Sequence, residues 1–189
     1  MEKKIKPWKE ISREIMFEKF GRGIEKVVFE QSDGEKVDLY IKKEKPVAAV
    51  VAFTPENKII LTKQFRPGPK KFLYDLPGGI AMNSSLNMEE FIAKELLEET
   101  GYKGDVKFIT DLVDCGYSTR IKNCLIATNC QKVQDIDNTL RDNDGENIGF
   151  KEEKEVVLFT LEEFRKLLQG GQCTDIEVGY LALDYLGLL

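Results

Sequence analysis

The sequence predicts an α/β (α+β) fold with a small antiparallel β region at its beginning, and three observations indicate this class. Residues 24–31 and 35–43 are rich in strand-forming side chains and flank Ser32-Asp33-Gly34, which is a favourable hairpin turn. Residues 47–53 (VAAVVAF) form a continuous apolar run, which is typical of a strand buried on both faces. Residues 87–101 combine apolar side chains at helical spacing with start and stop signals, so a helix is expected after the strands.

Apolar runs and the residues that interrupt them define the remaining strands. A charged connector over residues 42–45 ends at Pro46, so we expect a β subdomain at residues 1–45 and a main domain at residues 46–189. Residues 131–150 are polar and rich in Asp and Asn, which predicts a long mobile loop. Further strands are predicted at residues 58–66, 106–113, 123–128 and 155–160.

The helix after the first strands carries clear signals at both ends. It is expected to begin near Asn87, whose side chain can form a capping box with Glu90. It is expected to end at Gly101, because glycine tolerates the left-handed backbone that closes many helices. The apolar side chains on its core-facing side are Met88, Phe91, Ile92 and Leu96.

Two further helices are predicted at the end of the chain. Thr160 with Glu163 forms a capping box, and the helix it opens stops at Gly170-Gly171. Thr174 with Glu177 repeats the pattern for the final helix. That helix is expected to pack through Ile176, Tyr180 and Leu183.

Composition excludes several classes of function. The chain has 189 residues, of which 42% are hydrophobic and 32% charged, as expected for a globular protein with one sizeable core. Its net charge of −5 and pI of about 5.1 argue against a nucleic-acid partner, which requires a basic face. There is no apolar run of membrane-spanning length, and the charged first residues lack a secretory signal. We therefore expect no membrane partner and a cytoplasmic location.

The absence of histidine limits the chemistry further. It excludes a Ser-His-Asp triad, a histidine general base and a histidine-ligated zinc ion. The cysteines show no C-x-x-C spacing, so they are expected to be reduced and mostly buried thiols rather than zinc ligands. They are Cys115, Cys124, Cys130 and Cys173.

The stretch KELLEETGY, residues 94–102, contains three carboxylates that a helix would bring together. Glu95, Glu98 and Glu99 lie at i, i+3 and i+4, so they share one helical face. Each close pair of anions costs about 0.2–0.5 kcal/mol, and a divalent cation among them removes that cost. Hard oxygen ligands of this kind suit Mg²⁺, Mn²⁺ or Ca²⁺. A glutamate-rich run on a helix is more often a solvated face. This run, however, follows a Leu76-Pro77-Gly78-Gly79 turn and stops at a glycine. That context favours a metal site with Glu95 and Glu99 as principal ligands.

This stretch resembles the Nudix box, G-x5-E-x7-R-E-U-x-E-E-x-G-U, in which U is a bulky aliphatic residue. Its second half matches the pattern, except that Lys94 stands where the family has Arg and Tyr102 fills the last position less typically. The first half departs further, because the loop after Gly79 is one residue longer and the expected glutamate is missing, with Ser85 or Leu86 near its place. The matching positions are Glu95, Leu96, Glu98, Glu99 and Gly101.

The resemblance extends to the ADP-ribose pyrophosphatase branch of that family. Lys63-Gln64-Phe65-Arg66 followed by Asp75-Leu76-Pro77-Gly78-Gly79 looks like the Q-[FY]-R strand and the E-L-P-A-G turn of this branch. The resemblance implies an α/β/α sandwich with a mixed sheet. It also implies that the small N-terminal antiparallel β subdomain pairs with a second chain, which makes the protein a homodimer.

The family resemblance also assigns roles at the carboxylate triplet. It implies Mg²⁺ or Mn²⁺ held by Glu95, Glu98 and Glu99 together with the backbone carbonyl of Gly78. The family arginine orients these glutamates through a planar fork, whereas Lys94 offers only a point charge, so weaker orientation is expected or no more than a surface lysine.

The general base in this branch looks to be a glutamate on a loop late in the chain. Glu152 and Glu153 are the best positional matches, although a charged, solvated loop is the alternative for each.

Candidate substrate contacts are fewer and less specific. Arg66 can contact a phosphate or form a structural ion pair. Phe65, Tyr117 and Trp8 can stack on a base or pack in a core or dimer interface. Arg120 stands where ADP-ribose pyrophosphatases carry a glutamate, so it is a candidate clamp for phosphate or carboxylate groups.

The sequence thus predicts a Mg²⁺-dependent pyrophosphohydrolase that acts on a small molecule, a nucleoside diphosphate linked to a sugar or ribose. ADP-ribose and GDP-mannose are representative substrates, and a nucleoside monophosphate and a sugar phosphate are the products. One alternative is a binding or regulatory protein that kept the fold and lost turnover, which Lys94 and the degenerate loop favour. Another is a pyrophosphohydrolase of dinucleotide polyphosphates or CoA.

Overall fold

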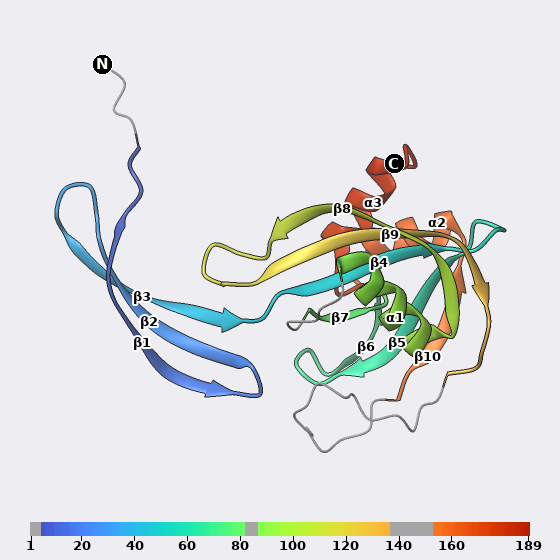
Figure 1. Ribbon diagram of the computed structural model, residues 1–189, viewed down its shortest axis with the longest axis horizontal. Coiled ribbons are helices and arrows are strands. Elements are labelled where there is room, and N and C mark those ends of the chain that lie inside the picture. Colours follow the sequence, from blue (N-terminus) through green and yellow to red (C-terminus); the bar gives the residue numbers. More distant parts are fainter. Residues whose placement is uncertain (1–4, 82–86, 137–152) are drawn as a thin grey trace. The chain divides into compact units, whose positions relative to one another are not determined.

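A computed structural model describes residues 5–81, 87–136 and 153–189 of the chain (Figure 1). The chain forms two compact units, Met1–Lys45 with Val113–Ile121, and Pro46–Leu112 with Lys122–Leu189. The strands are β1 (Lys9–Lys19), β2 (Arg22–Glu30), β3 (Lys36–Glu44), β4 (Val47–Phe53), β5 (Ile59–Arg66), β6 (Lys71–Asp75), β7 (Gly78–Ile80), β8 (Tyr102–Val113), β9 (Ile121–Lys132) and β10 (Glu155–Phe159). The helices are α1 (Met88–Thr100), α2 (Leu161–Gln169) and α3 (Ile176–Tyr185).

The first unit is a three-stranded antiparallel sheet in the order β1-β2-β3. The turn between β2 and β3 lies at the predicted Ser32-Asp33-Gly34 segment, where the backbone N–H of Gly34 donates to the carbonyl of Gln31 at 3.0 Å. The loop between β8 and β9 joins this unit, because the N–H of Lys42 donates to the carbonyl of Tyr117 at 2.9 Å. The predicted N-terminal antiparallel sheet is therefore confirmed, with an added loop from later in the chain.

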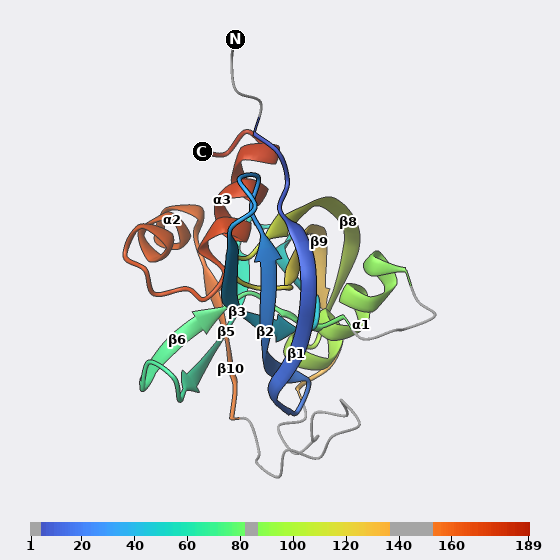
Figure 2. The same ribbon diagram turned by 90° about the vertical axis from the view of Figure 1, so that its left-hand side faces the viewer.

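The second unit is built on a mixed sheet in the order β10-β5-β4-β9-β8, with β6 paired to β5 and β7 paired to β4. Only β4 and β9 run parallel among the pairs given for this sheet in the described residues, since β5, β7 and β10 pair in antiparallel fashion. Helix α1 covers one face of the sheet, and α2 and α3 cover the other (Figure 2). The predicted α/β/α sandwich with a mixed sheet is confirmed.

Strand β4 shows why the sandwich forms. Successive side chains of a strand point to opposite faces. Val51 and Phe53 accordingly pack with α2 and α3, whereas Val50 and Ala52 pack with α1. A strand buried on both faces needs a continuous apolar run, and this is the pattern that predicted it.

The helix ends agree with two of the three capping predictions. In α1 the side chain of Asn87 accepts the N–H of Glu90 at 2.8 Å, and Gly101 adopts a left-handed backbone with φ of 78°. In α2 Thr160 and Glu163 form the predicted capping box. The prediction for α3 is wrong, because its N-cap is Asp175 and makes no side-chain cap hydrogen bond.

The failure at α3 has a local physical cause. The hydroxyl of Thr174, predicted as the cap, donates to the carboxylate of Asp75 at 2.7 Å and lies 2.9 Å from that of Asp175. A buried carboxylate such as Asp75 needs hydrogen-bond partners, and this need outweighs a helix cap.

Other predicted boundaries shift by a few residues. Strands β8 and β9 are longer than predicted, and the short strands β6 and β7 were not anticipated. Most of the predicted loop at residues 131–150 lies outside the described residues, while its first two residues complete β9. Among the described helices, none has both the length and the apolar character needed to cross a membrane.

Candidate active site

Helix α1 carries the carboxylate triplet at the border of its buried face. Phe91, Ile92 and Leu96 fix the helix against the sheet, since each is at most 9% exposed. Glu95 lies four residues after Phe91 and Glu99 three residues after Leu96, so both border this buried face, whereas Glu98 is exposed.

The Gly78-Gly79 segment lies directly against two of these glutamates. It forms β7, where Gly78 pairs with Ala49 and Gly79 pairs with Ala48. The N–H of Gly78 donates to Oε2 of Glu99 at 2.9 Å. A Cβ atom built on Gly79 would lie 2.9 Å from Oε2 of Glu95, so only glycine leaves that carboxylate its place.

The donors brought together here are of the chemical kind that a divalent cation binds. Glu95 and Glu99 lie one helical turn apart, and both are held against the backbone of β7. Carboxylate and backbone oxygens are the ligands that Mg²⁺ and Mn²⁺ prefer.

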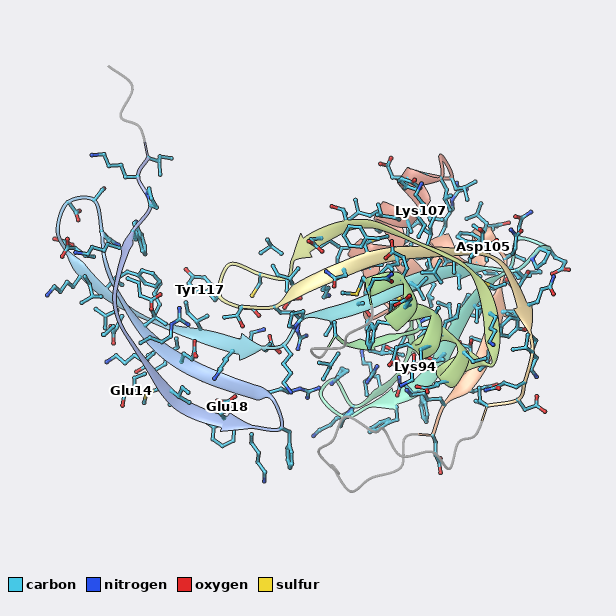
Figure 3. The ribbon with its side chains drawn as sticks, viewed as in Figure 1. Glu14, Glu18, Lys94, Asp105, Lys107 and Tyr117 are labelled. Carbon is cyan, nitrogen blue, oxygen red and sulfur yellow. The ribbon has the colours of Figure 1, made fainter. Side chains whose placement is uncertain are left out.

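The third glutamate of the triplet behaves differently. Glu98 forms an ion pair with Lys94, with 3.6 Å between Oε1 and Nζ, and both side chains are about half exposed, at 47% and 60%. Figure 3 marks Lys94 on α1. Lys94 therefore pairs with the outermost glutamate, and the expectation that a lysine orients the triplet more weakly than an arginine stays a prediction.

Lys154 is a contact that sequence reasoning missed. Its ammonium group donates to Oε1 of Glu99, and the two side chains are only 17% and 15% exposed. Lys154 lies in the charged run Lys151-Glu152-Glu153-Lys154-Glu155, whose glutamates alone were considered. The available signal was the mixed charge of that run, since a lysine between glutamates can face an acidic site.

The structure brings together only part of the predicted metal and catalytic set. Among residues 5–81, 87–136 and 153–189, no three Asp, Glu, Cys or His side chains converge closely enough to hold a metal ion. Glu152 lies outside the described residues. Glu153 is exposed just before β10 and borders a shallow pocket of about 270 Å³. The pocket is lined by Lys63, Phe72, Glu153, Lys154 and Glu155.

Two predicted substrate contacts lie on the β5–β6 hairpin. Phe65 is 51% exposed and packs edge-on against Phe72, with ring centroids 5.7 Å apart. Arg66 forms an ion pair with the buried carboxylate of Asp75, with 3.2 Å between Nε and Oδ2. The structure thus gives Arg66 the structural ion pair that was its alternative.

The other two predicted contacts belong to the first unit, as does Trp8. Tyr117 is 58% exposed at the loop between β8 and β9 (Figure 3). Arg120 forms an ion pair with Glu44, with 2.6 Å between Nη2 and Oε1, and both side chains are mostly buried. Trp8 packs on Phe29 at 6.2 Å between ring centroids. The substrate roles of Tyr117 and Arg120 stay predictions.

The cysteines behave as predicted from their spacing. All four are free, and only Cys115 is partly exposed. Burial raises the pKa of Cys124 and Cys130 to about 11 and that of Cys173 to about 12, so these thiols stay protonated and unreactive near neutral pH.

Comparison with known proteins identifies the class that this fold and site define. The sequence profile of the NUDIX domain matches residues 43–172, which is more than half of the chain. The chain therefore belongs to the Nudix family, and it is a Nudix hydrolase.

Individual relatives narrow the class. The ADP-ribose pyrophosphatase of Bacillus subtilis (strain 168) is 29% identical over 172 residues, which cover 82% of this chain and 87% of that protein. An uncharacterized Nudix hydrolase of Schizosaccharomyces pombe (strain 972 / ATCC 24843) is 30% identical over 141 residues, which cover 72% of this chain and 67% of that protein. The similarity to the Bacillus subtilis enzyme supports the predicted ADP-ribose pyrophosphatase branch of the family, and both similarities support the family itself.

A solved structure shows the same fold. The crystal structure of an ADP compounds hydrolase superposes with a TM-score of 0.75 at 16% identity, covering 99% of this chain and 100% of that chain. At this identity the likeness is one of fold.

Proposed function

We propose that this protein is a Mg²⁺- or Mn²⁺-dependent pyrophosphohydrolase of a nucleoside diphosphate linked to ribose or a sugar, with ADP-ribose as the first substrate to test. The observation that carries the proposal is the placement of Glu95 and Glu99 against Gly78-Gly79 in a Nudix fold. The relative named as an ADP-ribose pyrophosphatase supports the choice of substrate.

Diphosphate hydrolysis requires a bound metal ion and residues that hold and orient it. A bound divalent ion would neutralise phosphate charge and lower the pKa of an attacking water. In this proposal Glu95 and Glu99 hold that ion, the Gly78 carbonyl completes the set of ligands, and Glu98 contributes directly or through water. The N–H of Gly78 keeps Glu99 oriented.

The proton of the attacking water needs an acceptor on the chain. Glu152 and Glu153 are the candidates for this base, and Glu153 borders the pocket beside Lys154. Water attack on one phosphorus breaks the bond to the bridging oxygen, so the products are a nucleoside monophosphate and a sugar phosphate.

A substrate panel tests the proposal. Purified protein with Mg²⁺ or Mn²⁺ would be given ADP-ribose, GDP-mannose, UDP-glucose, a dinucleotide polyphosphate and CoA, and the products would be identified by mass. Release of AMP and ribose phosphate from ADP-ribose is expected. Turnover of CoA or the dinucleotide alone would refute the proposed substrate class.

A pair of isosteric variants connects the activity to the site. Glu99→Gln removes the charge of the inner glutamate, whereas Glu98→Gln makes the same change at the exposed one. We expect the first to lower kcat/KM by about 100-fold or more and the second to have a smaller effect. Equal turnover by Glu99→Gln and wild type would show that the metal assignment is wrong.

We also propose that the protein is a homodimer formed through β1. Every residue of this edge strand is exposed, including Ile11, Ile15, Met16 and Phe17. An edge strand with exposed apolar side chains favours pairing with another chain. Light scattering during gel filtration tests this proposal, and a mass of one chain at micromolar concentration would refute it.

A further inference from the structure

The ion pair between Lys154 and Glu99 has a consequence for metal binding. The Lys154 ammonium donates to Oε1 of Glu99, while Oε2 of the same carboxylate accepts the N–H of Gly78. Both oxygens of this glutamate are therefore engaged. A metal ion that coordinates Oε1 competes with the ammonium group for this oxygen, because two cations next to one carboxylate oxygen repel each other.

The position of Lys154 distinguishes it from the lysine in the box. Lys94 is 60% exposed and pairs with Glu98, so water screens its charge. Lys154 is 17% exposed and faces a carboxylate that is 15% exposed, where charges interact more strongly. The cation that acts on the inner glutamate thus comes from the segment before β10.

Lys154 also lines the pocket beside the site. Strand β10 lies beside β5 (Figure 1). The register of this pair brings Glu155 opposite Lys63. The Lys63 ammonium lies 6.0 Å from the ring centroid of Phe72 and 5.9 Å from that of Tyr74. The side chains of Lys63 and Lys154 are partly buried, whereas the neighbouring Glu153 and Glu155 are exposed to water. The pocket wall therefore carries two ammonium groups suited to phosphate oxygens.

We infer that Lys154 is a displaceable counter-cation: it neutralises Glu99 before metal binds, and after displacement it binds the phosphates of the substrate in the pocket with Lys63. This inference rests on the proposed function, because it assigns Glu99 to the metal. Four rotatable bonds let the lysine side chain move between the two positions. Metal and substrate then bind with positive cooperativity, since the group that the metal releases is used by the substrate.

Mn²⁺ binding without substrate is the direct test. Free Mn²⁺ would be counted by electron paramagnetic resonance for wild type and for Lys154→Met, which removes the competing charge. We expect Lys154→Met to bind Mn²⁺ about 5-fold more tightly or better, at the lower end of typical coupling between two ligands. Lys154→Gln serves as a second uncharged variant if the methionine variant does not fold, and Lys154→Arg, which keeps the charge, should not bind more tightly than wild type.

Two matched variants distinguish an effect on metal binding from an effect on binding of the substrate phosphates. Lys63→Met should leave Mn²⁺ affinity unchanged and weaken binding of α,β-methylene ADP-ribose, which cannot be cleaved at the diphosphate. Lys154→Met with saturating Mn²⁺ should weaken the same analogue. Lys166→Met is the control for loss of one lysine, because Lys166 pairs with Glu162 on α2 and is 70% exposed, so neither affinity should change.

The outcomes also separate this inference from the proposed function. Weaker or unchanged Mn²⁺ binding by the uncharged Lys154 variants would overturn the inference, even if wild type hydrolyses ADP-ribose. Wild type that binds no Mn²⁺ and hydrolyses nothing would overturn both. Tighter Mn²⁺ binding with a loss of analogue binding supports the exchange of Lys154 between the two positions.

Discussion

Two adjacent glycines provide a sharp test of the site, because the same substitution should affect the fold at one and the metal at the other. Gly78 and Gly79 both lie in β7, and neither has a left-handed backbone, so alanine is compatible with the backbone conformation at each position. What differs is the atom that the new methyl group would meet.

At Gly78 the methyl group would meet backbone. It would overlap the carbonyl oxygen of Ala48 and lie 2.9 Å from Cα of Ala49, both in the central strand β4. Backbone in a paired strand cannot move aside, so the cost falls at the upper end of overpacking, about 3 kcal/mol. For a protein of this size that corresponds to a loss of about 6–12 °C in Tm.

At Gly79 the methyl group would meet the end of a flexible side chain. It would lie 2.9 Å from Oε2 and 3.2 Å from Cδ of Glu95, which can swing away. We expect the free energy of unfolding to change by less than about 1 kcal/mol. The displaced carboxylate is a proposed metal ligand, however, so Mn²⁺ affinity should fall by about 10–100-fold, the range seen when the support of a ligand is lost.

Thermal unfolding followed by circular dichroism and Mn²⁺ binding followed by paramagnetic resonance measure the two effects separately. The expected result is a Gly78→Ala variant with a lower Tm and a Gly79→Ala variant with a nearly normal Tm and weak metal binding. A Gly79→Ala variant that binds Mn²⁺ like wild type would show that Glu95 lies on a solvated face and does not hold the ion.

Three further predictions follow from individual contacts. Arg120→Ala should lower the free energy of unfolding by about 2–3 kcal/mol in urea titrations, because it leaves the mostly buried Glu44 without its ion pair. An increase in KM without loss of stability would instead support a substrate clamp. Phe17→Asp on β1 should convert the proposed dimer to a monomer in light scattering, and an unchanged mass would place the interface elsewhere. The three buried thiols stay protonated in the folded chain, whereas in the unfolded chain they ionise with a pKa of 9.0. The free energy of unfolding should therefore be constant below about pH 9 and decrease between about pH 9 and 12. Replacing Cys173 by Ser should make that decline shallower in denaturant titrations across the same pH range.

Local patterns predicted much of the fold because local interactions decide those elements. The apolar run of β4 and the capping boxes at Asn87 and Thr160 depend on residues within seven positions of one another. The failed cap at Thr174 depends on Asp75, which lies 99 residues earlier. Strand β7 is similar, because three residues with two glycines form a strand only through pairing with β4. Contacts of this kind have no signature in a short window of sequence.

In the candidate site, too, residues close in sequence were predictable and contacts between distant residues were not. Helical spacing placed Glu95 and Glu99 on one face, and the glycine turn beside them followed from the motif. Spacing alone could not distinguish Glu98, which shares that face but is paired with Lys94 and half exposed. Arg66 and Arg120 show the opposite difficulty, since an arginine that can hold a phosphate can equally hold a carboxylate of its own chain, here Asp75 or Glu44.

Lys94, the lysine of the motif, is not the lysine that pairs with Glu99 in the structure, and helical geometry explains why. In a helix, Lys94 is four residues before Glu98 and five before Glu99, and side chains four apart are the ones that meet. The pairing of Lys94 with Glu98 follows from this geometry, so lysine at this position is directed to the outer glutamate. The inner glutamate is then left to a cation from another element, and Lys154, 55 residues later, provides it. If this division of roles holds, replacing Lys94 with Arg should change metal affinity less than replacing Lys154 with Met.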